Sequence, residues 1–312
     1  MTSQVSINAA TGEEIKSYPV HSEQEVQAAI GRAQEFFLKW RHVPVSKRAD
    51  AMRRVADVIL KNKQDYAAII TKEMGKPFKE SLAEVEKCAS AAKYFAENAE
   101  AFLNDGHVKT EYHKSYVTYQ PIGIVLGVMP WNFPFWQVLR YAFPTLVAGN
   151  ACLLKHASNV PQCALAVERV CRDARVDPAV FSLVCGDGAQ TGGPLMADPR
   201  VALVSATGST RMGRAVGEAC AKRFARSILE LGGNNAAIIA PTATLEMVER
   251  AVTFAAVGTA GQRCTTLRRL LVHASVYDTL VSRLQTIYGE LRMGTPLDEG
   301  TLVGPLIDRM AF

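Results

Sequence analysis

One cysteine, Cys264, stands in a stretch of small and polar residues, GTAGQRCTT, at positions 258–266. A cysteine thiolate is a strong nucleophile, and the charge of the preceding Arg263 could lower the pKa of the Cys264 thiol. The seven cysteines form no CxxC pair and have no regular spacing, so we expect mostly free thiols in a reducing compartment. Core packing is the expectation for those in apolar, periodic segments, namely Cys152, Cys163 and Cys171.

Two further motifs carry groups that could act on a carbonyl. Asn132, in MPWNFP, has an amide N–H₂ that could donate to a developing oxyanion; capping of the following helix is the alternative. Glu230, in LELGG, closes an apolar strand, where a carboxylate is costly to bury. A partly desolvated glutamate has a raised pKa and suits a general base, whereas a buried ion pair is the structural alternative.

A second pair of motifs is typical of nucleotide binding. In SATGSTRMG a strand precedes Gly208 and a helix starts near Ser209, so its exposed N–H groups favour a phosphate; a plain strand–turn–helix cap is the alternative. In LLKHASN, Lys155 ends a strand where it could hold an adenosine ribose or phosphate, unless it is simply solvated. Ser158 follows, and a serine there does not repel a 2′-phosphate as a glutamate would.

The elements that must position these residues alternate regularly. Helical spacing predicts three helices in the N-terminal part, at residues 23–40, 46–75 and 79–103. Residues 114–120 alternate like a strand. From Pro121, apolar runs alternate with helices, which predicts a parallel sheet covered on both faces, with ligands at the carboxyl ends of its strands. The alternation restarts after LGG, so a second domain is predicted from about Leu231.

Composition excludes some classes of function. The 312 residues are 48% hydrophobic and 21% charged, as in a soluble globular protein, and no apolar run could cross a bilayer. The net charge of +5 comes without a basic run, so we expect no nucleic-acid or membrane partner. The N-terminus lacks the pattern of a signal peptide, which indicates a cytoplasmic protein.

Four motifs in this order, MPWNFP, ATGST, LELGG and GQRC, resemble the aldehyde dehydrogenase superfamily. Glu230 and Cys264 are 264 − 230 = 34 residues apart, as in that family's pattern. The resemblance implies an α/β fold in which a Rossmann-like parallel sheet binds the cofactor and a second α/β domain carries the nucleophile. Residues 1–230 would form the NAD(P)-binding domain, with an oligomerisation arm near 109–120, and residues 231–312 the start of the catalytic domain.

The resemblance also implies roles for single residues. Cys264 would attack an aldehyde, Asn132 and the Cys264 backbone N–H would hold the oxyanion, and Glu230 would activate the water that hydrolyses the thioester. The implied cofactor is NAD or NADP, with contacts from Trp131, Lys155, Gly208 and Ser209, and Ser158 suggests that NADP is accepted. Transfer of the thioester to coenzyme A is an alternative that Glu230 disfavours.

The implied substrate is an aldehyde that carries a carboxylate. The N-terminal half resembles succinate-semialdehyde dehydrogenases and the part after about Val201 resembles aminoadipate-semialdehyde dehydrogenases. Arg140 and Arg263 stand where these branches hold the distal carboxylate, although either arginine could instead be a surface residue or a structural ion pair.

The resemblance also predicts that the chain is cut short, because family members continue beyond the LVGPLID segment near Phe312. An incomplete second domain would leave strand edges and apolar faces exposed. The alternative function is therefore a catalytically impaired fragment that binds a dinucleotide, and the homo-oligomer typical of the family is in doubt for this chain.

Overall fold

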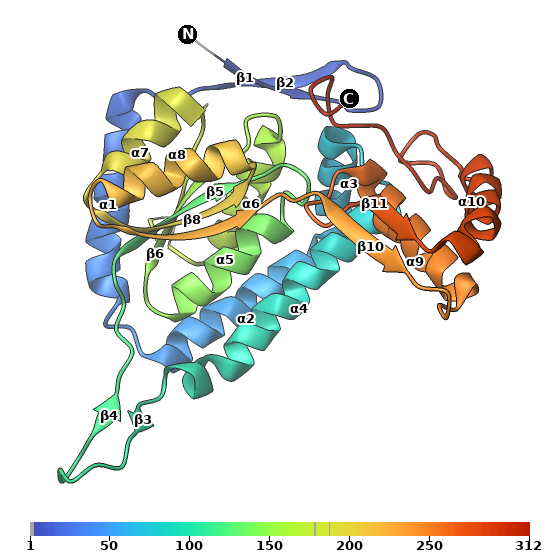
Figure 1. Cartoon of the computed structure of the whole chain (residues 1–312). Helices are drawn as coiled ribbons and strands as arrows, with labels where there is room; N and C mark the ends of the chain where they lie inside the picture. The colour runs from blue at the N-terminus through green and yellow to red at the C-terminus, as the bar shows by residue number, and fades with distance from the viewer. Residues whose placement is uncertain (1–2, 178, 187) are drawn as a thin grey trace.

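A computed structural model describes residues 3–177, 179–186 and 188–312. Its centre is a five-stranded parallel sheet in the order β7-β6-β5-β8-β9 (Figure 1). The strands are β5 (Ile124–Met129), β6 (Ala151–His156), β7 (Phe181–Val184), β8 (Val201–Gly208) and β9 (Arg226–Leu231). The first strand of this sheet in the sequence, β5, lies at its centre. The next two strands, β6 and β7, are added on one side and the last two, β8 and β9, on the other, so the strand order reverses between β5 and β8. Such a reversal opens a crevice at the carboxyl ends of the strands.

Helices cover both faces of the sheet, as the alternation predicts (Figure 1). On one face α1 (Glu23–Trp40), α7 (Gly193–Ala197) and α8 (Thr210–Ala221) lie over the sheet. The other face carries α2 (Val45–Lys61), α3 (Lys63–Met74), α4 (Phe78–Leu103), α5 (Trp136–Val147) and α6 (Pro161–Asp173). The central strands are continuous apolar runs because a strand between two helical layers has no face in contact with solvent.

The packing of α5 on the sheet depends on one glycine. A Cβ at Gly127, in the middle of β5, would lie 2.3 Å from the Tyr141 ring of α5. Glycine therefore lets the ring rest on the strand, which brings the start of α5 next to the carboxyl ends of β5 and β8.

The prediction of one long helix at residues 46–75 is wrong, because this segment forms two helices. The chain leaves helical geometry at Asn62 (φ −110°, ψ 18°), between α2 and α3. Asparagine is a weak helix former, and here its Nδ2 donates to the Val58 carbonyl. α3 ends at Gly75, whose φ of 85° is readily adopted only by glycine.

Coverage of both faces fails at the sheet edge. Five of the six residues of β9 are exposed, whereas every residue of β6 is buried. The reason is position, because β9 is the last strand of the sheet and, among the residues that the structure describes, no helix covers its open face as α5 covers β5. This edge matters because it carries Glu230.

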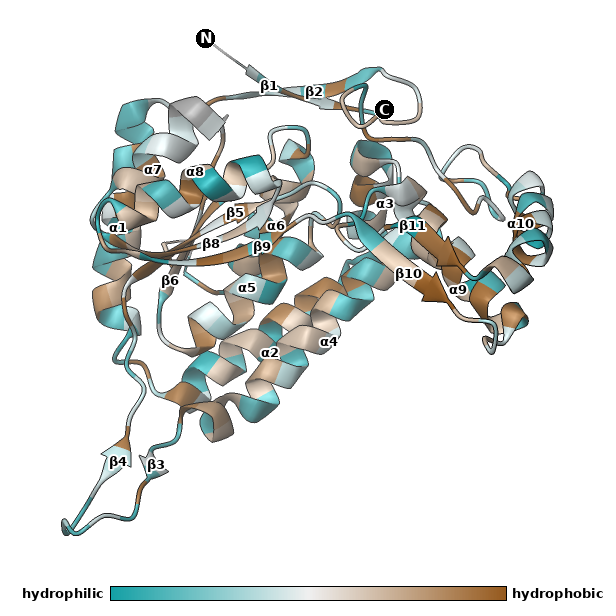
Figure 2. Ribbon diagram, viewed as in Figure 1, coloured by the Kyte–Doolittle hydropathy of each residue, from teal (hydrophilic) through white to brown (hydrophobic). Residues whose placement is uncertain are grey.

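A separate two-stranded parallel sheet follows, formed by β10 (Asn235–Ile239) and β11 (Leu267–Val272), with α9 (Leu245–Val257) and α10 (Ala274–Gly289) beside it. Hydrophobic residues occur in both strands (Figure 2), and two of them are open to solvent, with Ile238 81% and Leu271 54% exposed. The boundary between domains 1–230 and 231–312 stays a prediction, although the chain leaves the first sheet at Leu231.

Two hairpins complete the chain. β1 (Ser3–Ile7) pairs with β2 (Glu14–Pro19), and β3 (Gly106–His107) pairs with β4 (Tyr116–Val117). The second hairpin projects from the body as an arm (Figure 1), and only two residues of the predicted strand 114–120 are paired. Within the described residues, none of the helices has the length and apolarity to cross a bilayer.

Candidate active site

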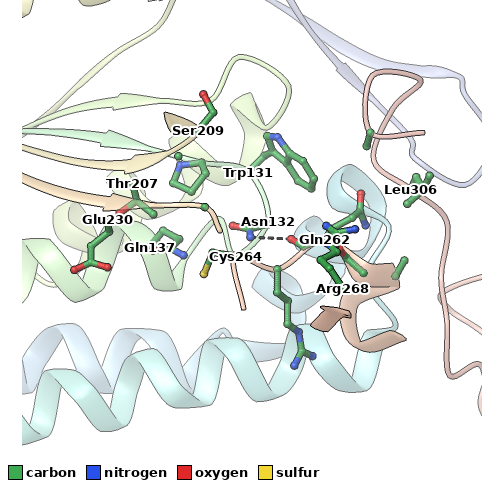
Figure 3. A pocket seen from close by; sticks show the side chains of 17 residues that line it. Trp131, Asn132, Gln137, Thr207, Ser209, Glu230, Gln262, Cys264, Arg268 and Leu306 are labelled. Atoms are coloured by element: carbon green, nitrogen blue, oxygen red, sulfur yellow. Dashed lines mark hydrogen bonds between the residues drawn. The ribbon is translucent and has the colours of Figure 1, made fainter. Parts of the chain in front are cut away.

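A cavity of about 490 Å³ lies at the carboxyl ends of β5, β8 and β9 and faces the loop before β11. Figure 3 shows how far-apart segments meet in it, with Trp131 and Asn132 after β5, Thr207 to Ser209 at β8, Glu230 at β9 and Cys264 on the facing loop. The cavity thus brings together the three residues predicted to act on a carbonyl.

The loop of Asn132 is held from several sides. Glu84 Oε1 accepts the backbone N–H groups of Phe135 and Trp136, both at 3.0 Å. Glu84, and not Asn132, therefore caps α5, and the capping alternative for Asn132 is wrong. Asn132 is 9% exposed, and its Nδ2 donates to the Gln262 carbonyl at 2.8 Å. An amide nitrogen has two hydrogens, so the second remains for an oxyanion.

Cys264 follows a tight turn whose geometry brings the thiol to the cavity. Thr259 and Ala260 have φ of 55° and 53°, and Gly261 has φ of 73°. Asn235, at the start of β10, donates to the carbonyls of Cys264 and Thr266 at 2.8 and 2.9 Å. These contacts connect the Cys264 loop to the second sheet.

Cys264 differs from the other six cysteines, all of which are free and buried whereas it is exposed. The core packing predicted for Cys152, Cys163 and Cys171 is confirmed. Burial raises the pKa of the Cys152 and Cys163 thiols well above the ordinary value and that of Cys171 to about 12. Burial also raises the pKa of Cys185 to about 11.

We expect iodoacetamide to modify one thiol in the folded chain and all seven in denaturant, because alkylation needs an accessible thiolate. Peptide mass spectrometry should place the fast modification on Cys264. A Cys264→Ala variant is the control and should show no fast phase. Labelling of a second cysteine at a similar rate in the native chain would contradict this assignment.

His156 links β6 to the Asn132 loop. It ends β6 next to Lys155, its Nδ1 accepts the Ala157 N–H at 2.8 Å, and its Nε2 lies 2.9 Å from the Pro134 carbonyl. Since an N–H can only donate, Nδ1 carries no proton, and Nε2 must donate to Pro134. Burial lowers the pKa of His156 to about 4, so the ring is neutral near pH 7.

We expect His156 to make the chain less stable in acid. Its pKa is about 4 when folded and 6.5 when unfolded, so the unfolded chain binds more protons between these values. Stability from this residue is complete above pH 6.5 and is lost as pH falls toward 4, by about 2 kcal/mol between pH 7 and pH 5. Urea unfolding at both pH values should give this difference for the unaltered chain relative to His156→Gln. Equal pH dependence in the two proteins would contradict it.

Of the predicted cofactor residues, Trp131, Gly208 and Ser209 line the main cavity, whereas Lys155 and Ser158 lie at and beyond the end of β6. Lys155 is buried, and its Nζ donates to the His156 carbonyl at 2.6 Å; solvated lysine, the alternative, is wrong. Ser209 caps α8, where its Oγ accepts the Met212 N–H at 3.2 Å and its own hydroxyl hydrogen can donate. Ser158 is exposed three residues after Lys155, and Trp131 lines the cavity. The start of α8 at the cavity offers backbone N–H groups of the kind that bind a phosphate.

The expectation that Glu230 is desolvated is wrong, because its side chain is exposed on the open edge strand β9. Neither a buried general base nor a buried ion pair describes it. Glu230 and Thr207 line both the main cavity and a second cavity of about 410 Å³. Arg140 lines this second cavity and donates through Nη2 to Thr207 Oγ1 at 3.1 Å.

Arg263 borders the main cavity, but its guanidinium contacts protein groups. Nε donates to Thr259 Oγ1 at 2.9 Å, and Nη2 lies 3.6 Å from Glu80 Oε2. The structural ion pair left open by the sequence is therefore present, and a substrate carboxylate would have to displace Glu80. Carboxylate binding by Arg263 stays a prediction.

Several residues of the site were not predicted from sequence. Gln262, two residues before Cys264, accepts from Asn132 through its carbonyl, and its Oε1 accepts the Ile307 N–H at 3.1 Å. Gln137 lines the cavity from α5, and Asn235 holds the Cys264 carbonyl. Their proximity to motif residues was a usable signal, but amides are too common for their type alone to mark a role.

Sequence and structure comparisons agree with this arrangement. The chain belongs to the aldehyde dehydrogenase family, whose sequence profile matches residues 2–312. A probable succinate-semialdehyde dehydrogenase [NADP(+)] of Synechocystis is 40% identical over 300 residues, which cover 96% of this chain and 66% of that protein. Succinate-semialdehyde dehydrogenase [NADP(+)] 1 of Mycobacterium bovis is also 40% identical, with the same coverage. The chain thus spans 66% of the length of these curated relatives.

Solved structures confirm the fold. A succinic semialdehyde dehydrogenase from Streptococcus pyogenes, in complex with NADP+, has a TM-score of 0.95 and 31% identity, covering 98% of this chain and 68% of that one. The succinate-semialdehyde dehydrogenase from Burkholderia pseudomallei has a TM-score of 0.95 and 32% identity, with 99% and 64% covered. The α/β class and the Rossmann-like sheet are therefore confirmed.

Proposed function

We propose that this chain carries the site of an NAD(P)-dependent aldehyde dehydrogenase that oxidises a carboxylate-bearing semialdehyde, such as succinate semialdehyde, to the acid. The observation that carries the proposal is the meeting of Asn132, Glu230 and the exposed Cys264 in one cavity. These residues are up to 132 positions apart (264 − 132), so nothing but the fold brings them together.

The proposed chemistry begins at Cys264. Its thiolate attacks the aldehyde carbon and forms a tetrahedral thiohemiacetal. The oxyanion accepts from the free hydrogen of Asn132 Nδ2 and from the Cys264 backbone N–H. Loss of hydride gives a thioester, and a water activated by Glu230 hydrolyses it to release the acid. Exposure keeps the Glu230 carboxylate in contact with water, the reactant that it would activate.

The cofactor, when bound, supplies the hydride acceptor. The start of α8 at Ser209 and the cation of Lys155 would hold the phosphates and ribose of the cofactor. Gly208 has no side chain, so the backbone at this position could lie close to the cofactor. Ser158 presents no negative charge beyond β6, which favours acceptance of NADP. The names of the similar succinate-semialdehyde dehydrogenases support the same preference.

Arg140 is the residue we propose for the substrate carboxylate. It lies beside Thr207, which like Glu230 lines both cavities, and its side chain is partly exposed. A guanidinium binds a carboxylate through two parallel hydrogen bonds, which would favour semialdehydes over plain alkanals. Arg263 is the weaker candidate because Glu80 occupies its Nη2.

We also propose that the β3–β4 arm joins copies of this chain, because its exposed residues include the apolar Val108, Tyr112 and Val117. A cytoplasmic location and the absence of nucleic-acid partners remain predictions.

The test is formation of reduced cofactor by the purified chain with succinate semialdehyde and either NADP or NAD. We expect turnover that is higher with NADP and that Cys264→Ala abolishes. Equal rates with and without Cys264 would contradict the proposal. Dinucleotide binding without turnover would instead favour the alternative, a binding chain with an inactive site, which the exposure of Glu230 and of the β10–β11 sheet supports.

A further inference from the structure

The first two turns of α4 contact both halves of the proposed site. Lys76, just before α4, forms an ion pair with Glu84 in which both side chains are at most 1% exposed. Glu84 also holds the N–H groups that begin α5, and the Lys76 Nζ lies 3.6 Å from the centre of the Phe133 ring. This end of α4 therefore fixes the loop that presents Asn132.

The same turns reach the loop that presents Cys264. Glu80 Oε2 accepts the Thr259 hydroxyl at 3.1 Å and lies 3.6 Å from Arg263 Nη2. The Thr259 hydroxyl in turn accepts from Arg263 Nε at 2.9 Å. One carboxylate thus connects to both side chains, although neither Glu80 nor Thr259 lines the main cavity.

The held conformation is one that this sequence does not favour. Thr259 is β-branched, is 2% exposed and has φ of 55°, in the left-handed region that suits glycine or asparagine. Such a conformation persists when surrounding contacts enforce it. The contacts here are those of Glu80 and Arg263, and the turn they enforce leads directly into Cys264.

The two loops also meet through an aromatic ring. The Arg263 guanidinium lies 5.7 Å from the Phe133 ring centre and 4.8 Å from that of Phe254. Phe133 is next to Asn132 and also contacts Lys76, so it lies between the two anchored loops.

We propose that Glu80 is a positioning residue, which holds the Thr259 turn so that Cys264 stands in reach of the oxyanion donor Asn132. The catalytic part of this inference rests on the proposed function, whereas the structural part does not. Glu80 acts through Thr259 and Arg263, and the pair of Lys76 and Glu84 fixes the opposite loop to the same helix end.

The experiment compares Glu80→Ala and Glu80→Gln with Glu86→Ala and Glu86→Gln in the full chain. Glu86 is a matched control because it lies on the same helix and pairs with a lysine, Lys63, at 2.6 Å on the surface. Hydrogen exchange of residues 258–266 and 130–136 is followed by mass spectrometry, together with kcat and KM for succinate semialdehyde.

We expect Glu80→Ala to speed exchange in 258–266 by roughly tenfold, the effect of losing one hydrogen bond to a charged group. Glu80→Gln should retain part of the protection, since its amide carbonyl can still accept from Thr259. In a folded variant kcat should fall about tenfold or more with little change in KM, because Glu80 lies outside the cavity. Glu86 variants should change neither quantity.

Unchanged exchange in Glu80→Ala, or equal acceleration in Glu86→Ala, would overturn the proposal. Faster exchange with an unaltered kcat would also overturn it, since the turn would then be structural only. If the unaltered chain has no turnover, the proposed function fails, and the exchange comparison still decides whether Glu80 holds the turn.

Discussion

Asn132→Ala should lower kcat by about 10² to 10³-fold, the loss typical of removing one oxyanion donor. The amide has one hydrogen on the Gln262 carbonyl and one for the substrate oxygen, so its removal takes away a preorganised donor. The measurement is steady-state oxidation of succinate semialdehyde by the variant and the unaltered chain.

Alkylation of Cys264 by iodoacetamide is the control for Asn132→Ala, because that reaction develops no oxyanion. We expect its rate to change by about twofold at most, which would separate loss of oxyanion stabilisation from displacement of the thiol. A variant that retains more than about a third of the kcat would contradict the role of Asn132.

The second large effect concerns stability. Lys76→Met should lower the free energy of unfolding by about 3–5 kcal/mol, because it leaves the Glu84 carboxylate buried without its cation. Adding Glu84→Gln should recover much of the loss, since a neutral amide oxygen can still accept the Phe135 and Trp136 N–H groups.

Urea unfolding of the single and double variants measures this coupling. The matched control is Lys63→Met, which breaks the surface pair with Glu86. We expect this variant to lose at most about 1 kcal/mol of the free energy of unfolding. A double variant no more stable than Lys76→Met would contradict the account of the buried pair.

Most of the sheet could be predicted from sequence, because its strands are short apolar runs between amphipathic helices. The prediction failed where long-range packing decides the outcome. The apolar spacing continues across Asn62, so only backbone geometry shows the break between α2 and α3. Burial of β9 was inferred from its composition, yet its place at the sheet edge leaves Glu230 exposed.

The site was predictable in its motifs and unpredictable in its supports. Asn132, Glu230 and Cys264 lie in recognisable short motifs, and the structure brings them to one cavity. Glu80 and Glu84 lie in a helix whose sequence is rich in charges, where most carboxylates are solvated. Their partners are 179 and 51 positions away, and no local pattern records contacts at such separations.

The most direct test of the proposed chemistry is capture of the covalent intermediate. The chain is mixed with succinate semialdehyde and NADP, quenched in acid, digested and analysed by mass spectrometry. We predict that the peptide containing Cys264 carries the mass of a succinyl group, that the adduct requires NADP, and that it builds up in Glu230→Gln, where hydrolysis is slowed. Oxidation of the aldehyde without an adduct on Cys264 in either protein, or oxidation that survives Cys264→Ala, would contradict it.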